Sequence, residues 1–341
     1  MKAPPALIVN SVDIPIVLPS RSCPDKLLPH HYCERRVGGR YRVPSEPPEA
    51  AEEVSDMSDP KLREMITGGR FITAPGVFDM ISTLVADRMG FPALYVTGYG
   101  VSASHLGLPD AGLMTYTDMA DRVRRIAEAA ETPVIADADT GYGGLLNVRH
   151  AVRGYEAAGV SAIQIEDQEF PKKCGHTLGR RVIPLKDMVS KIKVAVDSRS
   201  SADFLVIART DSRTSLGLDE ALRRAEAFSE AGADVIFVES PESEQEMRAI
   251  NAAIDKPTLA NMVSGGRTPI LPAEELQKLG FAIGIHPALG FLAVGAALKS
   301  AYGVLAETGD VKGAALEDFG EFNKLVGFED VWEFDARWAE I

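Results

Sequence analysis

The sequence has few cysteines, and it has no surplus of positive charge. The three cysteines, at positions 23, 33 and 174, are too few and too scattered for a disulfide scaffold. A net charge of -13 and a pI near 5.0, with no dense stretch of Lys and Arg, exclude an ordinary nucleic-acid-binding surface. These absences favour a protein of the reducing cytoplasm that has no nucleic-acid partner.

A membrane-spanning run is also lacking. The most apolar stretch, 281–298, is interrupted by glycines, His286 and Pro287, so it falls short of the roughly 18 to 20 apolar residues that cross a bilayer. We therefore expect no membrane partner. Hydrophobic residues make up 45% of the chain and charged residues 25%, which is typical of a soluble globular protein.

The first 60 residues differ from the rest of the chain. Ten of the 21 prolines lie at or before Pro60, and this stretch shows neither helical nor strand periodicity. We expect a flexible, proline-rich extension over 1–60, or a natural start at Met57. The less favoured alternatives are a transit peptide and a metal site formed by Cys23, His30, His31 and Cys33.

From Arg70 onward the chain repeats one unit, a short apolar run followed by a loop and an amphipathic segment. The predicted strands are Phe71–Pro75, Ala93–Gly98, Pro133–Asp137, Ala162–Asp167, Phe204–Thr210, Val235–Ser240, Thr258–Met262 and Ala282–His286. The clearest predicted helices between them are Met119–Ala130, Val148–Ala158, Asp187–Ser198, Leu218–Ala231 and Glu244–Ile254.

Eight such units predict an α/β fold, a closed (β/α)8 TIM barrel over residues 61–310. An open doubly wound sheet is the alternative. A long apolar helix, Ala288–Ala306, follows the eighth strand, and a C-terminal helical tail occupies 311–341. So much apolar helix suggests packing against a second subunit or against the same barrel.

Carboxylates dominate the positions where the predicted strands end, which is where the active groups of such a barrel lie. Charged groups there are costly unless they are paired or bind a cation. We therefore predict a Mg2+ site, with Mn2+ as a substitute ion, in which Asp137 is a direct ligand and the bound waters contact Asp110, Asp139 and Glu166. The alternative is a structural role, in which Asp167 and Asp211 cap helices and Asp110 is an ordinary loop residue.

The loop after the fourth predicted strand carries a cysteine among basic residues, in the sequence PKKCGH. Neighbouring cations lower the pKa of a thiol, so Cys174 is a candidate for proton exchange at neutral pH. The alternative is an inert cysteine in a mobile loop.

These motifs carry a resemblance to a known family. DADTGYGG, IEDQ, KKCGH and IARTD, in this order, resemble the isocitrate lyase and phosphoenolpyruvate mutase superfamily over residues 69–339. KKCGH marks its lyase branch. The segment NMVSGGRTP, His286-Pro287 and the C-terminal residues resemble the 2,3-dimethylmalate lyase and petal death protein group. Methylisocitrate lyases usually carry an acidic and an aromatic residue where Ser264 and Gly265 stand here.

The resemblance implies a role for each matching residue. The catalytic group comprises Cys174 as proton donor, with Arg209, His176 and Glu166. The substrate, a small dicarboxylate, is expected to contact Tyr95, Thr97, Gly98, Tyr99, Asp137, Gly175, Arg209, Glu239 and Asn261. The implied assembly is a homotetramer with C-terminal helices exchanged between subunits.

These groups predict a lyase that cleaves a 2-alkyl or 2,3-dialkyl malate into a 2-oxo acid, such as pyruvate, and a carboxylate. The alternatives are an oxaloacetate hydrolase, a methylisocitrate lyase, phosphonate chemistry and a barrel that only binds ligands.

Overall fold

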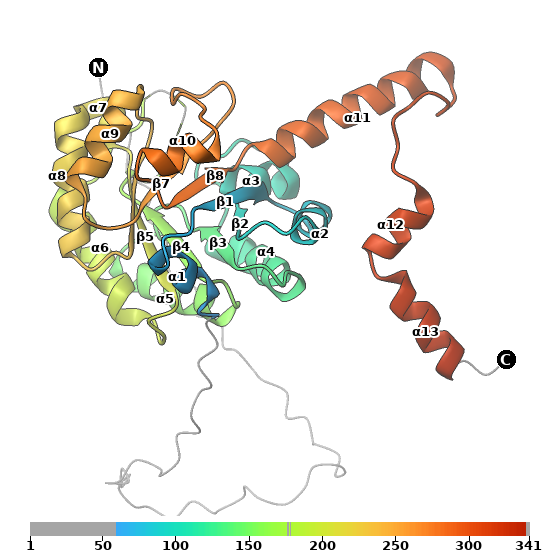
Figure 1. The fold of residues 1–341 in the computed structure, drawn as a ribbon, viewed down its shortest axis with the longest axis horizontal. Helices are drawn as coiled ribbons and strands as arrows, with labels where there is room; N and C mark the ends of the chain where they lie inside the picture. The colour runs from blue at the N-terminus through green and yellow to red at the C-terminus, as the bar shows by residue number, and fades with distance from the viewer. Residues whose placement is uncertain (1–58, 176, 178, 339–341) are drawn as a thin grey trace, which may run out of the picture. The chain divides into compact units, whose positions relative to one another are not determined.

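A computed structural model describes residues 59–175, 177 and 179–338 of the chain. Eight parallel strands close into a barrel in sequence order, with helices around it (Figure 1). The strands are β1 (Ile72–Val77), β2 (Leu94–Val96), β3 (Val134–Asp137), β4 (Ala162–Glu166), β5 (Leu205–Thr210), β6 (Val235–Val238), β7 (Thr258–Asn261) and β8 (Ile283–His286). The predicted TIM barrel is confirmed, and the pairing of β8 with β1 excludes the open sheet.

The helices follow the strands as expected, and several were not predicted individually. They are α1 (Lys61–Thr67), α2 (Met80–Arg88), α3 (Gly98–Leu106), α4 (Tyr116–Ala129), α5 (Leu145–Ala157), α6 (Leu185–Ser198), α7 (Ser212–Leu216), α8 (Leu218–Glu230), α9 (Glu244–Ala253), α10 (Ala273–Lys278), α11 (Leu289–Thr308), α12 (Phe319–Leu325) and α13 (Phe328–Trp338). The expected N-terminal extension lies almost entirely outside the described residues.

Alternation of side chains along each strand separates two apolar layers. On β5, Val206 and Ala208 face the surrounding helices, whereas Leu205 and Ile207 fill the barrel interior. The interior position that follows next on this strand is Arg209, at its carboxyl end. The same period of two therefore builds the core and directs a charged side chain to the mouth of the barrel.

The register between strands brings the predicted site residues together. Glu166 on β4 pairs with Arg209 on β5, and Asp137 on β3 pairs with Gln164 on β4. Parallel strands in a barrel end at the same face, so groups from β3, β4 and β5 lie side by side there although they are far apart in sequence.

Helix α4 shows why the outer helices form where they do. Thr115 and Asp118 form a reciprocal capping box at its first turn, which satisfies two main-chain N–H groups. Met119, Val123 and Ile126 recur at helical spacing and are buried against the barrel. Cap and apolar face together fix the start and the orientation of the helix.

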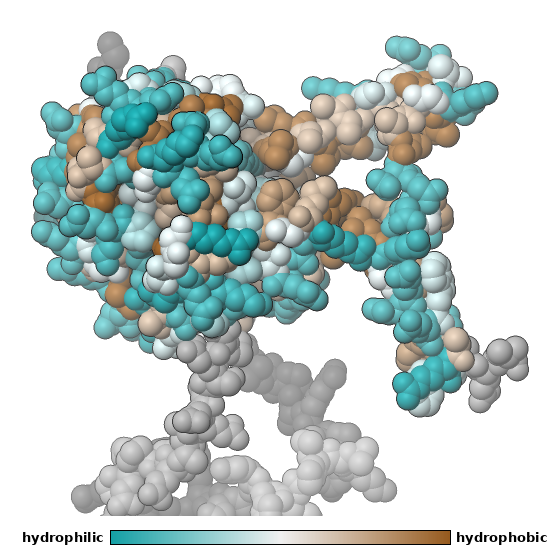
Figure 2. Space-filling view, in the orientation of Figure 1, coloured by the Kyte–Doolittle hydropathy of each residue, from teal (hydrophilic) through white to brown (hydrophobic). Residues whose placement is uncertain are grey.

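Helix α11 is apolar but exposed. None of its residues is buried, and Leu298, Tyr302 and Leu305 are among its exposed side chains (Figure 2). The structure also corrects the expectation that no segment has the length and hydropathy to cross a membrane: this 20-residue helix has a mean hydropathy of 1.6 and meets both criteria. Gly290 and Gly295 lie inside this one continuous helix, whereas Gly284 lies on β8.

Candidate active site

A cavity of about 260 Å³ opens at the carboxyl ends of the strands. Most of the predicted site residues line it: Tyr95, Thr97, Tyr99, Asp110, Asp137, Glu166, Cys174, Gly175, Arg209, Glu239 and Asn261. Gly98 and Asp139 lie directly behind Asp137, since the N–H of Gly98 donates to Asp137 Oδ2 at 3.3 Å and that of Asp139 donates to Asp137 Oδ1 at 3.0 Å. His176 lies outside the described residues.

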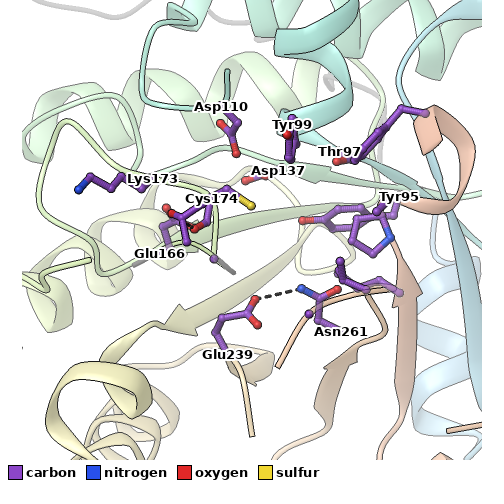
Figure 3. A pocket seen from close by; sticks show the side chains of 18 of the residues that line it. Tyr95, Thr97, Tyr99, Asp110, Asp137, Glu166, Lys173, Cys174, Glu239 and Asn261 are labelled. Carbon is purple, nitrogen blue, oxygen red and sulfur yellow. Dashed lines mark hydrogen bonds between the residues drawn. The ribbon is translucent and has the colours of Figure 1, made fainter. Parts of the chain in front are cut away.

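Three of the four predicted ion-binding carboxylates, Asp110, Asp137 and Glu166, line this pocket (Figure 3). Asp137, Asp139 and Glu166 are buried at the ends of β3 and β4. Burial raises the pKa of Glu166 well above its usual range, and Arg209 offsets only part of this effect. Burial also raises the pKa of Asp139 to about 7, despite the nearby Lys172. Hydrated cations stabilise the charged form of such carboxylates.

The donor set suits a hard divalent cation. Oxygen Oε1 of Glu166 is fully buried and has no hydrogen-bond partner among the described residues, which is a costly arrangement unless a cation or its water occupies the space in front of it. Within the described residues, no three His, Cys, Asp or Glu side chains converge as a compact metal centre. An ion held by few protein oxygens and several waters fits both observations.

Lys172 is a member of the site that the sequence did not reveal. Its ammonium group is 3% exposed, lies 2.6 Å from Asp139 Oδ1 and also pairs with Asp110. Burial alone would lower the pKa of Lys172, but Asp139 and Asp110 raise it well above its ordinary value. The loop that carries Cys174 thus brings a positive charge among these carboxylates.

Arg209 links these carboxylates to Glu239. Its guanidinium donates to Asp211 at 3.0 and 2.9 Å, and its nitrogens lie 3.4 Å from Glu166 and 3.3 Å from Glu239. Glu239 in turn accepts a hydrogen bond of 3.0 Å from Asn261. These contacts hold a fixed guanidinium at the site, with planar geometry suited to a carboxylate.

Asp211 and Asp167 are structural, although neither caps a helix through its side chain as the alternative supposed. Asp211 begins α7 without a side-chain cap and instead pairs with Arg209 and Arg180. Asp167 accepts from Thr210 and from the main chain of Asp211, and it pairs with Arg224 at 2.9 Å. Both carboxylates brace the end of β5.

Main-chain groups at the start of α3 provide a second place for an anion. Thr97 is the N-cap of this helix, and Gly98 is its first residue. A side chain at Gly98 would lie 2.8 Å from Asp137 Oδ2, so only glycine allows this close approach. The N–H groups at a helix N-terminus favour negative charge, and that of Gly98 already donates to the Asp137 carboxylate.

The thiol of Cys174 points into the space between these groups (Figure 3). The side chain is partly exposed. Gly175 is buried against Arg209, and a Cβ at this position would clash with the guanidinium and lie 3.0 Å from Glu239 Oε2. This glycine lets the loop lie flat on the strand ends and brings the neighbouring thiol over the carboxylates.

Left-handed backbone conformations occur beside the site. Among the described residues, the non-glycine positions with positive φ are Asp139 (50°), Tyr142 (59°) and Ser240 (62°). Each follows a strand whose end lines the pocket. Strained backbone of this kind persists where surrounding contacts fix it, and it is common at functional sites.

Part of the pocket lining is apolar. Val263, Ile285, Phe291 and Leu292 belong to this part, and the ring of Phe291 lies 4.9 Å from that of Tyr99. Phe291 and Leu292 belong to the first turn of α11, which the sequence had not placed at the pocket. The pocket therefore combines charged side chains, apolar side chains and a thiol.

Comparison with known proteins identifies relatives over most of the chain. Residues 62–305 match the family model described as phosphoenolpyruvate phosphomutase. The chain is 50% identical to 2,3-dimethylmalate lyase of Eubacterium barkeri over 281 residues, which cover 82% of this chain and 97% of that protein. It is 37% identical to 2-methylisocitrate lyase of Bacillus subtilis over 276 residues, with coverage of 81% and 90%.

Solved structures agree with these relatives. A complex of oxaloacetate acetylhydrolase with 3,3-difluorooxalacetate has a TM-score of 0.78 at 35% identity and covers 81% of this chain and 95% of that one. A structure of 2,3-dimethylmalate lyase has a TM-score of 0.77 at 37% identity, with coverage of 81% and 93%. A complex of phosphonopyruvate hydrolase with oxalate and Mg2+ has a TM-score of 0.74 at 30% identity, with coverage of 82% and 98%.

Proposed function

We propose that this protein, which belongs to the phosphoenolpyruvate mutase and isocitrate lyase superfamily, is a magnesium-dependent carbon–carbon lyase that cleaves a 2-alkyl or 2,3-dialkyl malate. The observation that carries the proposal is the thiol of Cys174 facing a pocket that is lined by carboxylates and by apolar side chains. The charged side chains suit the hydroxy acid, and the apolar side chains suit alkyl substituents.

The carboxylates would hold the ion, with Asp137 as a direct ligand and waters on Asp110, Asp139 and Glu166. When bound, Mg2+, or Mn2+ in its place, lowers the pKa of the 2-hydroxyl group and favours the 2-oxo acid that forms. Thr97 and the main chain of Gly98 and Tyr99 would hold the carboxylate of this half of the substrate. The phenol of Tyr95, whose pKa burial raises, stays protonated and donates to Gln164 Oε1 at 2.9 Å.

The chain's own groups can complete the reaction. A base removes the hydroxyl proton, and its raised pKa makes Glu166 a suitable base. The bond from C2 to C3 then breaks, and its electron pair moves to C3. Arg209 stabilises the charge that develops on the departing carboxylate. Cys174 then donates its proton to C3, and the proton taken from the hydroxyl restores the thiol. The role expected for His176 falls outside the described residues.

Two other substrates share this chemistry. Oxaloacetate hydrolysis is favoured by the resemblance to oxaloacetate acetylhydrolase. Oxaloacetate, however, has no alkyl substituent to contact the apolar side chains of the pocket. Methylisocitrate carries a third carboxylate. The described cationic residues of the lining are Lys172, Lys173 and Arg209, and Lys172 is already paired with two carboxylates. The alkylmalate therefore fits best.

The proposal is tested by assaying product release with Mg2+ from 2-methylmalate, 2,3-dimethylmalate, 2-ethyl-3-methylmalate, methylisocitrate, isocitrate and oxaloacetate. Wild type and Cys174→Ser are compared, with Cys33→Ser as the matched cysteine control. We expect a 2-oxo acid from an alkylmalate, lost only in Cys174→Ser. If oxalate from oxaloacetate were the sole product observed, the protein would be assigned as the hydrolase instead of the lyase. If no substrate gave a product, the assignment would be refuted.

We propose further that the exposed face of α11 packs against a second copy of this chain, in a soluble homotetramer of the cytoplasm. The exposed Leu298, Tyr302 and Leu305 support this arrangement, because apolar side chains in such number are usually covered. Light scattering on the purified protein measures the assembly directly, and a monomeric mass would contradict it.

A further inference from the structure

The segment that carries Cys174 is a loop whose two ends are hydrogen-bonded to each other. Gln168 and Val182 form an antiparallel bridge. On either side of it, the N–H of Glu169 donates to Arg181 O at 2.9 Å, and that of Ile183 donates to Asp167 O at 2.8 Å. The base of the loop is therefore fixed to the end of β4, and contacts inside the loop decide where the thiol lies.

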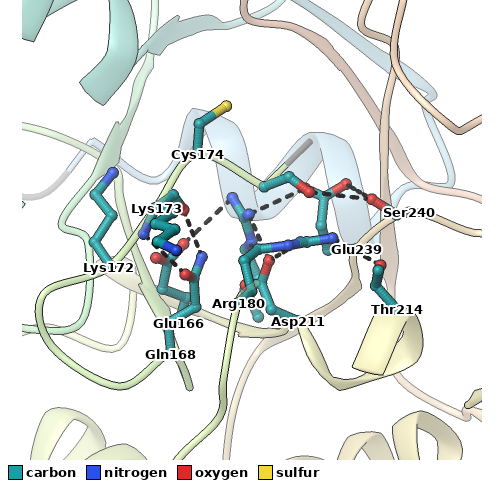
Figure 4. A network of polar contacts seen from close by, with 12 residues as sticks. Glu166, Gln168, Lys172, Lys173, Cys174, Arg180, Asp211, Thr214, Glu239 and Ser240 are labelled. Atoms are coloured by element: carbon teal, nitrogen blue, oxygen red, sulfur yellow. Dashed lines mark hydrogen bonds and ion pairs between the residues drawn. The ribbon is translucent and has the colours of Figure 1, made fainter. Parts of the chain in front are cut away.

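At this base, the side chain of Gln168 both donates a hydrogen bond to the main chain of the loop and accepts one from it. Its Nε2 donates to Lys173 O at 2.8 Å, and its Oε1 accepts from Lys173 N–H at 3.0 Å (Figure 4). The residue is 2% exposed. Because one partner is a carbonyl and the other an N–H, only one orientation of the carboxamide satisfies both.

The carbonyl of Lys173 belongs to the peptide unit that joins Lys173 to Cys174. Its carbonyl oxygen accepts from Gln168, and its N–H, which belongs to Cys174, donates to Asp110 O at 3.2 Å. A peptide unit is planar, so fixing both of its polar groups fixes the direction in which the chain enters Cys174. Ser240 Oγ adds a contact of 3.4 Å to Gly175 O on the other side.

We propose that Gln168 is a positioning residue for Cys174: its carboxamide clamps the main chain of Lys173 and thereby holds the thiol toward the pocket. The inference rests on the proposed function for the role of Cys174 as proton donor. Gln168 acts through the loop, since it is absent from the residues that line the cavity. Losing the clamp should therefore impair the proton transfer and leave the binding groups of the strand ends in place.

Two substitutions break the clamp in different ways. Gln168→Met keeps the size of the side chain and removes both hydrogen bonds. Gln168→Glu keeps an acceptor for Lys173 N–H but places a second acceptor against Lys173 O. For both variants we expect kcat to fall by about 30-fold or more while KM changes by less than about threefold, because proton transfer by a positioned group contributes roughly 10²- to 10⁴-fold.

A second readout is independent of turnover. The alkylation rate of Cys174 by iodoacetamide, followed by mass spectrometry of its own peptide, should rise at least about fivefold in Gln168→Met, because a released loop exposes the thiol. Arg181→Met is the matched control in the loop: it removes a side chain that is 80% exposed, and it keeps the main-chain hydrogen bond from Glu169 N–H to Arg181 O. Gln277→Glu makes the same chemical change on the exposed surface of α10.

Wild-type alkylation and wild-type kcat in Gln168→Met would overturn the proposal, and so would an equal change in Arg181→Met. If Gln168→Met does not fold, Gln168→Asn, whose shorter side chain cannot span both partners, carries the same test. The outcome is separable from that of the proposed function. If Cys174→Ser were active, Cys174 would not be the proton donor. The alkylation rate of Cys174 would still decide whether Gln168 holds the loop.

Discussion

The two halves of the pocket are built in different ways. The strand-end half consists of charged side chains on β3, β4 and β5, and Arg209 alone contacts three carboxylates there. The loop half, with Cys174 and Gly175, is held by hydrogen bonds to its main chain and by the ion pairs of Lys172. The difference indicates that binding and chemistry are carried by separable parts. Changes at the strand ends should abolish binding, whereas changes in the loop should lower turnover and leave binding intact.

The largest effect should come from removing the ion from the strand-end half. Chelation, or Asp137→Asn, should abolish turnover. Mg2+ at about 100 times its Kd should stabilise the wild type against unfolding by about 2.7 kcal/mol, by mass action, and Asp137→Asn should lose this gain. Denaturant unfolding with and without Mg2+ measures both. The loop variant Gln168→Met serves as control and should keep the gain; a gain retained by Asp137→Asn would place the ion elsewhere.

Arg209→Lys should have the next largest effect. It keeps the charge but loses the planar fork that contacts Asp211 twice. We expect kcat/KM to fall by about 10³-fold, the upper range for loss of one preorganised donor. Steady-state kinetics on the preferred malate tests this. Arg213→Lys is the matched control, because Arg213 pairs with Glu242 and Glu246 and does not line the pocket. Equal losses in both variants would contradict a specific role.

A smaller effect is expected at the far end of the loop. Arg180 is buried there, pairs with Asp211 and donates to Thr214 at 2.7 Å. Arg180→Met should lower the free energy of unfolding by about 2 kcal/mol. It should lower kcat about tenfold with little change in KM, because the ion pair between Asp211 and Arg209 remains in the variant. The adjacent Arg181, whose side chain is 80% exposed, provides the control Arg181→Met. If KM rose and kcat did not fall, the inference that the loop serves turnover and the strand ends serve binding would be wrong.

The smallest effect should lie behind the strand ends. Tyr142 and Tyr155 share a hydrogen bond of 2.6 Å, and Tyr155 donates to the main-chain oxygen of Asp137 at 3.1 Å. Tyr142→Phe removes one of these bonds and should cost about 1 kcal/mol of stability, with kcat within about threefold of wild type. Thermal unfolding and kinetics test this together. A large loss of activity would mean that the tyrosines act in the reaction itself.

Much of the barrel follows from local sequence patterns. Val134, Ile135 and Ala136 form a continuous apolar run because a strand in a covered parallel barrel is buried on both faces, and Asp137 at the end of the run marks the mouth. Helix α3 was harder to predict, since Gly98 and Gly100 weaken its helical signal. Its start depends on the N-cap Thr97, and its close approach to Asp137 is a tertiary contact.

The candidate site was predictable where it follows strand ends and hidden where it depends on distant contacts. Asp110 and Lys172 are 62 positions apart and meet only because the loop after β4 folds over the barrel. A lysine in a polar loop is ordinarily solvated, so nothing local to Lys172 indicated that it is buried. Gln168 was quoted within a motif, but its bonds to Lys173 depend on the conformation of the loop.

Helix α11 imposes a constraint on how this pocket can change in evolution. Its first turn carries Phe291 and Leu292 into the pocket, and its later turns carry the exposed Leu298 and Leu305. A helix is rigid over this length, so a substitution that tilts the first turn to admit a bulkier substrate also displaces the apolar residues beyond it. New substrates are therefore reached most easily through Val263 and its loop neighbours, which can vary without moving that surface.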